Sequence, residues 1–283
     1  MYSLLPQVVD LQGLRGGNDD EIQVDLVAIS FVVLFEKRGL TMNTNLSYQD
    51  MLTLHVLGAL GVCRFKEAVI LSGYRAYKYG AKKLKELEDN KFIASAYIDR
   101  RKCIFLTGKG YKAIGKQKAG YKINNTTLHD VEVATIATWL YLTKGISYAD
   151  LLTDRQMKYL LVGSNIHRPD IVLESVCYEF EKSIKDKKRL LEILKENRKY
   201  EKQVWIVREK FLENRIKRFA QDNIIQNVEV IMLDTIKEYV DGADYFTNEV
   251  RAEAVLGERN IELVKRGTNN IMDKYNTGGW EDV

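Results

Sequence analysis

A change of hydrophobic period within residues 50–107 constrains this chain more than any other feature. Apolar residues recur at helical spacing from Asp50 to Asp89, with a break at Ser72-Gly73, and glycine is typical of the turn between two such helices. Two short strands then flank the charged tip Asp99-Arg100-Arg101. The pattern predicts helices at Asp50–Cys63, Lys66–Leu71 and Tyr74–Asp89 and strands at Phe92–Ile98 and Lys102–Thr107. This order is that of a winged helix-turn-helix.

The charge of the chain is concentrated in the same region. The whole chain carries +4, but residues 64–122 hold sixteen Lys or Arg against five Asp or Glu, so that this segment carries +11 and the remainder −7. Such asymmetry favours a polyanionic partner for the basic segment, although a solvated basic face is the alternative. Charge alone does not choose between them.

The third predicted helix places its basic residues where a nucleic acid could reach them. Lys78, Lys82 and Lys85 recur at i, i+4 and i+7, which gives a stripe about 10 Å long. Lysines so placed contact phosphates, and a nearby arginine can reach a base edge. We therefore predict double-stranded DNA as the partner, with a winged module used for protein contacts as the alternative. The predicted DNA-binding residues are Arg75, Lys78, Tyr79, Lys82, Lys85, Arg100 and Arg101.

The remaining composition indicates a globular, cytoplasmic protein. Three cysteines, Cys63, Cys103 and Cys177, are widely spaced, which suits buried free thiols in a reducing compartment. The most apolar window, Val24–Phe35, is shorter than a membrane span, and we expect it to lie in a buried helix running from Asp19 to Lys37. We expect no membrane partner.

A second pattern begins at His129. Helices and short apolar strands alternate from there, which predicts an α/β layer and an α+β fold class for the whole chain. The expected helices are Asp130–Leu142, Ile184–Tyr200 and Phe211–Gln221, and the expected strands are Met157–Val162, Ile171–Leu173, Cys177–Glu181, Val204–Val207 and Val228–Leu233.

Acidic residues cluster around two of these strands. Asp170 opens one strand, and Glu179 and Glu181 share one face of the next. Three such carboxylates can bind Mg²⁺ and support hydrolysis of a phosphodiester. The alternative is that both glutamates lie on the solvent face of an edge strand. To His129 and His167 we assign no catalytic role.

The element order from His129 to Leu233 resembles the PD-(D/E)XK nuclease superfamily. With a winged helix before it, the chain resembles the replication-relaxation family of mobile-element proteins over roughly residues 50–235. The resemblance implies work in plasmid replication or mobilisation. It implies that Asp170 and Glu179 are the motif's acids and that Glu132 is an additional metal ligand. Glu181, however, stands where the superfamily usually has Lys.

The sequence thus predicts an N-terminal helical extension (1–45), a winged helix-turn-helix (46–118), a PD-(D/E)XK nuclease-like domain (126–240) and a C-terminal helical or irregular tail (241–283). We favour a DNA-binding protein of a plasmid or other mobile element whose nuclease-like domain is a scaffold, non-cleaving or conditional. Two alternatives stay open: a Mg²⁺-dependent endonuclease using Asp170, Glu179 and Glu181, and a winged-helix transcriptional regulator. Mg²⁺ is the expected cofactor only if the protein cleaves. A homodimer and other replication or mobilisation proteins are further expected partners.

Overall fold

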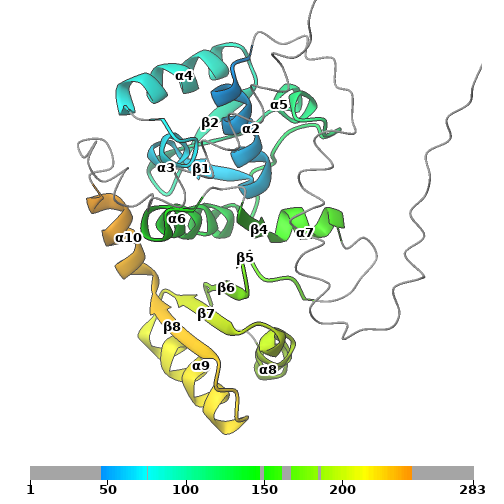
Figure 1. The fold of residues 1–283 in the computed structure, drawn as a ribbon, viewed down its shortest axis with the longest axis vertical. Helices are drawn as coiled ribbons and strands as arrows, with labels where there is room; N and C mark the ends of the chain where they lie inside the picture. Colours follow the sequence, from blue (N-terminus) through cyan, green and yellow to red (C-terminus); the bar gives the residue numbers. More distant parts are fainter. Residues whose placement is uncertain (1–45, 75, 147–149, 161–166, 184–185, 244–283) are drawn as a thin grey trace, which may run out of the picture. The chain divides into compact units, whose positions relative to one another are not determined.

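A computed structural model describes residues 46–74, 76–146, 150–160, 167–183 and 186–243. Within these residues the chain is a mixed α+β fold (Figure 1). The predicted N-terminal helix and the tail beyond residue 243 lie outside the described residues. In the part that is described, no helix combines the length and apolarity that crossing a bilayer requires.

The first segment of the fold combines helices with a small antiparallel sheet. We use the name first segment for Tyr48–Ala113. Its elements are α2 (Tyr48–Leu60), β1 (Val62–Arg64), α3 (Phe65–Leu71), α4 (Tyr77–Asp89), β2 (Ile93–Ile98), β3 (Arg101–Leu106) and α5 (Gly108–Ala113). The strands lie in the order β1-β3-β2, and both pairings are antiparallel.

Local sequence signals explain where these elements begin and turn. Helix α2 begins with a capping box in which the Ser47 hydroxyl accepts from the Asp50 backbone N–H and the Asp50 carboxylate accepts from the Ser47 N–H. The β2–β3 hairpin closes through a two-residue loop, Asp99-Arg100, in which both residues have positive φ. That backbone suits the twist of a tight hairpin, so the basic tip is a defined turn.

The second segment, Thr127–Gly242, is built on a five-stranded sheet in the order β4-β5-β6-β7-β8. Strands β4, β5 and β6 pair antiparallel, whereas β6, β7 and β8 run parallel and are joined through helices. The elements are α6 (Thr127–Lys144), β4 (Leu151–Thr153), α7 (Asp154–Leu160), β5 (Ile171–Leu173), β6 (Val176–Glu181), α8 (Lys187–Glu196), a 3₁₀ turn (Asn197–Lys199), β7 (Lys202–Val207), α9 (Lys210–Asp222), β8 (Val228–Met232) and α10 (Leu233–Gly242).

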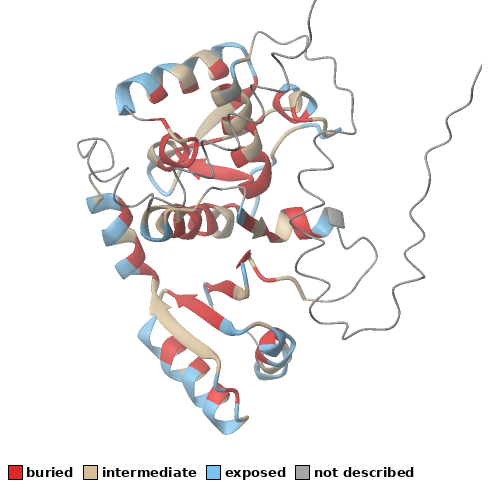
Figure 2. Cartoon of the chain, in the orientation of Figure 1, coloured by how far each residue is buried: buried red, intermediate tan, exposed pale blue. Residues whose placement is uncertain are grey.

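Both faces of the central strands are covered: Figure 2 shows β5 and most of β7 as buried, whereas the edge strand β8 is intermediate. Because side chains alternate along a strand, Tyr178 and Phe180 face the core that contains α6 and α10. Trp205 and Val207 face a separate core with α8 and α9. The sheet therefore has α6 on one side and the α8–α9 layer on the other.

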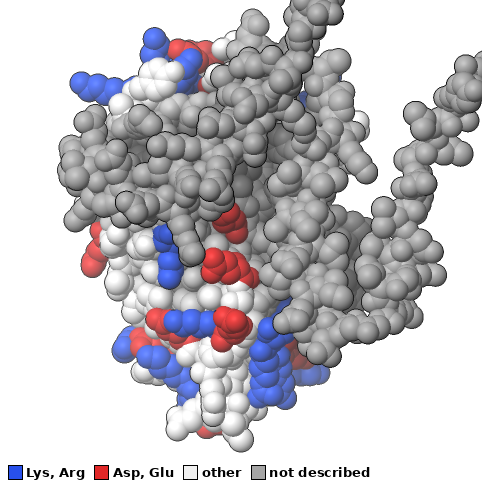
Figure 3. All heavy atoms as spheres, viewed as in Figure 1, with Lys and Arg blue, Asp and Glu red and all other residues white. Residues whose placement is uncertain are grey.

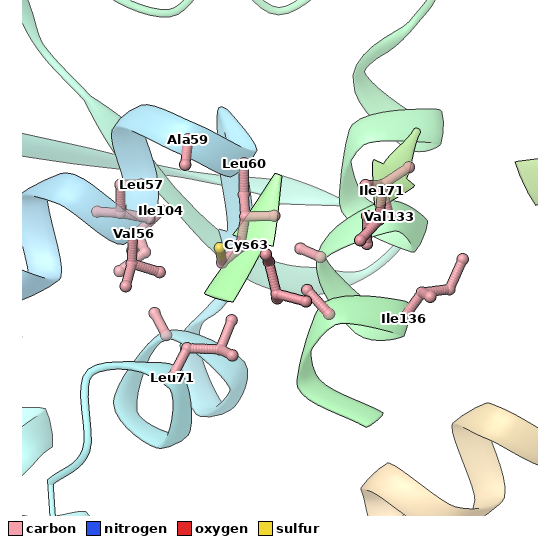
Figure 4. Packing of buried hydrophobic residues seen from close by; sticks show 14 of the residues in the cluster. Val56, Leu57, Ala59, Leu60, Cys63, Leu71, Ile104, Val133, Ile136 and Ile171 are labelled. Atoms are coloured by element: carbon pink, nitrogen blue, oxygen red, sulfur yellow. The ribbon is translucent and has the colours of Figure 1, made fainter. Parts of the chain in front are cut away.

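One hydrophobic core joins the two segments. Figure 4 shows Leu57 and Cys63 of the first segment packed together with Val133 of α6 and Ile171 of β5. The described residues, which begin at 46 and end at 243, accordingly belong to one compact unit. Close packing of this kind transmits displacements between the segments, because such interiors contain few voids.

Several elements differ from the prediction. Residues 157–160 belong to helix α7, so the strand expected at Met157–Val162 is wrong over its described part: a short apolar run does not by itself distinguish a helix from a strand. Strands β1 and β4 were not predicted, because three residues carry no measurable period. Helix α10 was also missed.

Candidate functional site

Helix α4 has one buried side and one charged, exposed side. The buried side carries Gly80, Leu84 and Leu87. At about 100° per residue, Lys78, Lys82 and Lys85 lie almost opposite it, and all three are exposed. We call these three residues the lysine stripe. The side chain of Lys82 is 75% exposed, and its Nζ lies 3.9 Å from a Glu86 carboxylate oxygen. Because the pair is exposed to solvent, it is weak, and the Lys82 ammonium remains accessible to a ligand.

Two tyrosines flank the beginning of this stripe. Tyr79 is 55% exposed, and its ring meets that of Tyr74 edge-on at 6.0 Å. Tyr77 is 41% exposed and packs edge-on against Phe65. The predicted contact residue Arg75 lies outside the described residues. The surface of α4 therefore combines cations with partly exposed aromatic rings.

The hairpin is tied to both α4 and α10. Lys102 Nζ lies 3.2 Å from a Glu88 carboxylate oxygen, which holds the hairpin against α4. Arg100 is exposed at the tip. Arg101 donates to both carboxylate oxygens of Asp241 at 3.1–3.2 Å, and both side chains are about half exposed. One predicted contact residue at the tip is thus engaged by the last described helix.

Asp170 bridges the start of β5 and strand β6. Its Oδ2 accepts a hydrogen bond from the Phe180 backbone N–H at 2.7 Å, and its Oδ1 lies 3.4 Å from His129 Nε2. The His129 ring also packs on the Phe180 ring at 5.4 Å between centroids. The aspartate is therefore held by groups from α6 and β6.

Glu179 and Glu181 are buried on one side of β6. They are 3% and 5% exposed, so the interpretation that placed them on a solvent face is wrong. The Glu179 carboxylate is hydrogen-bonded to the His167 ring, and it accepts from Asn197 Nδ2 at 2.8 Å. Glu181 Oε1 accepts from the Ser183 backbone N–H at 3.3 Å. The α8–α9 side of the sheet thus encloses both acids.

The environment of Glu179 disfavours its charged form. Burial raises the pKa of this carboxyl above its ordinary value, and the neighbouring charge of Asp170 raises it further. The hydrogen bonds from His167 and Asn197 lower the pKa but do not cancel the effect of burial. Asp170 lies beside this position in the chain fold, because its carboxylate accepts from the backbone N–H of Phe180, the residue that follows Glu179.

Glu132 is separately engaged in a buried ionic cluster. It has no solvent exposure, and its carboxylate pairs with Arg64 at 3.4 Å, Arg208 at 2.7 Å and Lys237 at 2.9 Å. Arg64 also pairs with the buried Glu67 at 3.2 Å. Three cations thus pair with one carboxylate of α6: Arg64 of the first segment, Arg208 directly after β7 and Lys237 of α10.

The acids proposed as metal ligands are not arranged as a metal site. Among the described residues, no group of three or more His, Cys, Asp or Glu side chains is placed to bind an ion. Protein donors contact Asp170 and Glu179, and three cations surround Glu132. In this arrangement the carboxylates are engaged by protein donors and cations, whereas Mg²⁺ binds carboxylate oxygens together with water or phosphate oxygens.

The sequence identified the acids but missed their partners. His167 and His129, to which we assigned no catalytic role, contact Glu179 and Asp170. The other partners lie 18 to 105 residues along the chain from the acids they contact, so no local motif predicts them. They are Asn197, Arg208 and Lys237. Among these partners, only His167 could have been suspected from the sequence, because it lies three residues before Asp170.

Comparisons of the chain with protein-family models, with curated proteins and with solved structures find no match.

Proposed function

We propose that this chain is a DNA-binding protein that acts in the replication or mobilisation of a plasmid or other mobile element, or in its control. The lysine stripe carries the proposal: three lysines at helical spacing project from the outer side of α4, opposite its buried side. Figure 3 shows Lys and Arg side chains at the end of the molecule where Figure 1 places α4. The mobile-element setting rests on the family resemblance.

The arrangement around the stripe supports duplex DNA as the ligand. The order α2-β1-α3-α4-β2-β3 and the sheet order β1-β3-β2 are those expected of a winged helix-turn-helix. In that motif the exposed side of the second helix of the pair enters a major groove, and basic residues contact phosphates. Here that helix is α4, and the tip residue Arg100 is available to a neighbouring part of the backbone.

The second segment would then serve as a scaffold. Its order α6-β4-β5-β6-α8-β7, with three antiparallel strands followed by a parallel one, supports a PD-(D/E)XK-like core, and α7 is an addition between β4 and β5. Its acids are enclosed by internal partners, which argues for a structural role. The shared hydrophobic core would hold this scaffold against the DNA-binding helix.

Binding of labelled duplex DNA, measured over a range of salt concentrations, tests the proposal. Lys78→Glu with Lys82→Glu should weaken binding at least about tenfold and reduce the salt slope by about 2, because each lost phosphate contact removes about 0.9 from the slope. Lys112→Glu with Lys144→Glu makes the same charge change at exposed sites on α5 and α6 and should have a smaller effect. Equal losses in both variants, or no loss in the first, would reject the proposed surface.

A nuclease is the second candidate, favoured by the position of Asp170 at the start of β5, beside the neighbouring strand β6 that carries Glu179 and Glu181. Supercoiled plasmid incubated with the protein and Mg²⁺ or Mn²⁺ separates the two functions. The scaffold proposal predicts no nicking by the wild type. Nicking that disappears in both Asp170→Asn and Glu179→Gln, while duplex binding persists, would establish the enzyme and reject the scaffold.

A further inference from the structure

The α8–α9 layer forms a groove on its outer side that the proposed DNA-binding function does not use. Leu190, Leu212 and Ile216 of these helices pack toward Trp205 of the sheet. A hollow lies along the outer sides of these helices. Its lining includes Lys187, Phe211, Asn214, Arg215, Arg218 and Phe219. We call this hollow the α8–α9 groove.

Two aromatic rings lie in the groove beside cations. Phe211 is 50% exposed, whereas Leu212, Ile216 and Trp205 are buried in the hydrophobic cluster beneath α9, so the Phe211 side chain presents apolar surface to solvent. Lys187 Nζ and Arg215 Cζ lie 5.4 Å and 5.6 Å from the centre of the Phe219 ring. Both distances are within the range of cation–π attraction. The groove therefore presents rings and positive charge together.

The balance of charge in the groove favours an anionic ligand. Three of its lining residues are cations and one, Asp222, is an acid. The other nearby acid of α9, Glu213, is engaged by Lys210 at 2.6 Å and Lys217 at 2.7 Å, so its charge is compensated away from the groove. Figure 3 shows Lys and Arg side chains, with Asp and Glu among them, over the part of the molecule where Figure 1 places α8 and α9.

The spacing of these groups suits a strand of unpaired nucleotides. Phe211, Arg215 and Arg218 recur at i, i+4 and i+7 on α9, which places a ring and two cations along about 10 Å of one helix side. A single strand offers both base faces, which stack on aromatic rings, and phosphates, which pair with cations. In a duplex the base faces are stacked on one another, so an exposed Phe ring would gain no such partner.

We propose that the α8–α9 groove binds single-stranded nucleic acid, with Phe211 as the stacking platform and Arg215 and Arg218 as phosphate contacts. The groove lies on the side of the sheet away from α6 and its core with the first segment. Single-strand binding here and duplex binding by α4 would be separate activities of one chain. The groove proposal does not depend on the function proposed for α4.

Fluorescence anisotropy with the full-length protein tests it, using labelled oligo-dT and oligo-U about 16 nucleotides long. Phe211→Ala should weaken binding of the better-bound oligonucleotide about tenfold, which is the loss typical of one stacked base. Phe211→Tyr should bind like the wild type, because it retains an aromatic ring. Tyr239→Ala is the matched control, because Tyr239 of α10 is 48% exposed and lies outside the groove. Thermal melting would check that each variant is folded.

Comparison of the oligonucleotides and of two further variants completes the test. Arg218→Gln should reduce the salt dependence of single-strand binding, and Lys82→Glu should weaken single-strand binding less than Phe211→Ala does. If oligo-dT binds more tightly than oligo-U, the preferred ligand is single-stranded DNA, and if oligo-U binds more tightly, it is RNA. The proposal is overturned if neither oligonucleotide binds at low salt, if Phe211→Ala binds like the wild type, or if Lys82→Glu weakens single-strand binding more than Phe211→Ala does.

Discussion

The lysine stripe of α4 and the acidic cluster of Asp170, Glu179 and Glu181 place their charges in opposite surroundings. The lysines stand on the outer side of a helix and face solvent. Glu179 and Glu181 are enclosed beneath the α8–α9 layer, and internal donors contact the carboxylates of the cluster. The stripe is thus available to a ligand, whereas the acids already have partners within the fold.

This difference shows that the same kind of motif, charged residues at regular spacing, has two physical meanings. Exposed charges cost little to maintain and act at a distance on a polyanion. Buried charges are costly to desolvate and persist only with compensating partners. Three changes, at two buried acids and one half-exposed acid, test this comparison.

The largest effect is expected at Glu132. Glu132→Gln keeps the size of the side chain but leaves Arg64, Arg208 and Lys237 without their shared counter-charge, and breaking a buried ion pair costs about 3–5 kcal/mol. Chemical denaturation measures the loss. Glu238→Gln, at an exposed site on α10, should change stability by less than about 0.5 kcal/mol. A loss below about 1 kcal/mol at Glu132 would mean that the cluster is not needed for folding.

Glu179→Gln should have a smaller effect of the opposite sign. The folded protein binds a proton at Glu179 more tightly than the unfolded chain does, because burial raises the pKa above 4.5. The contribution of Glu179 to wild-type stability should therefore fall as pH rises above about 4.5, and the neutral variant should avoid that loss. We therefore expect the variant to be more stable than the wild type near neutral pH.

Stability curves measured at several pH values check this expectation. The advantage of Glu179→Gln should grow as pH rises from acid toward neutral. Glu174→Gln, at an exposed position, should show no such trend. A variant less stable than the wild type at neutral pH would show that the charged form of Glu179 is favoured by its partners.

The sequence predicted the elements that have a strong period. Helices α4 and α9 and strand β7 lie close to their predicted positions, because each has a continuous amphipathic or apolar pattern. Three-residue strands such as β1 have no period to read. Helix α10 was missed because its apolar residues continue directly from those of β8, so no polar break separates strand from helix.

The candidate site was predictable only in its residue types. The spacing of Glu179 and Glu181 correctly placed them on one side of a strand, but burial of that side depends on helices from elsewhere in the chain. Likewise, the interpretation of Glu132 as a metal ligand took no account of cations up to 105 residues away. Tertiary packing determines whether an acid is exposed, and a local motif does not contain that information.

The smallest expected effect concerns Asp241, whose contact links α10 to the basic hairpin. Asp241→Asn weakens the ion pair with Arg101, and because both side chains are about half exposed, stability should fall by less than about 1 kcal/mol. Under the proposed function, a released Arg101 adds one phosphate contact, so duplex affinity should rise severalfold and the salt slope by about 0.9. Asp234→Asn provides an exposed control on the same helix. Unchanged duplex affinity with a measurable loss of stability would assign the Arg101–Asp241 contact to folding alone. Arg101 would then resemble the internal acids in that its charge serves the fold and not a ligand.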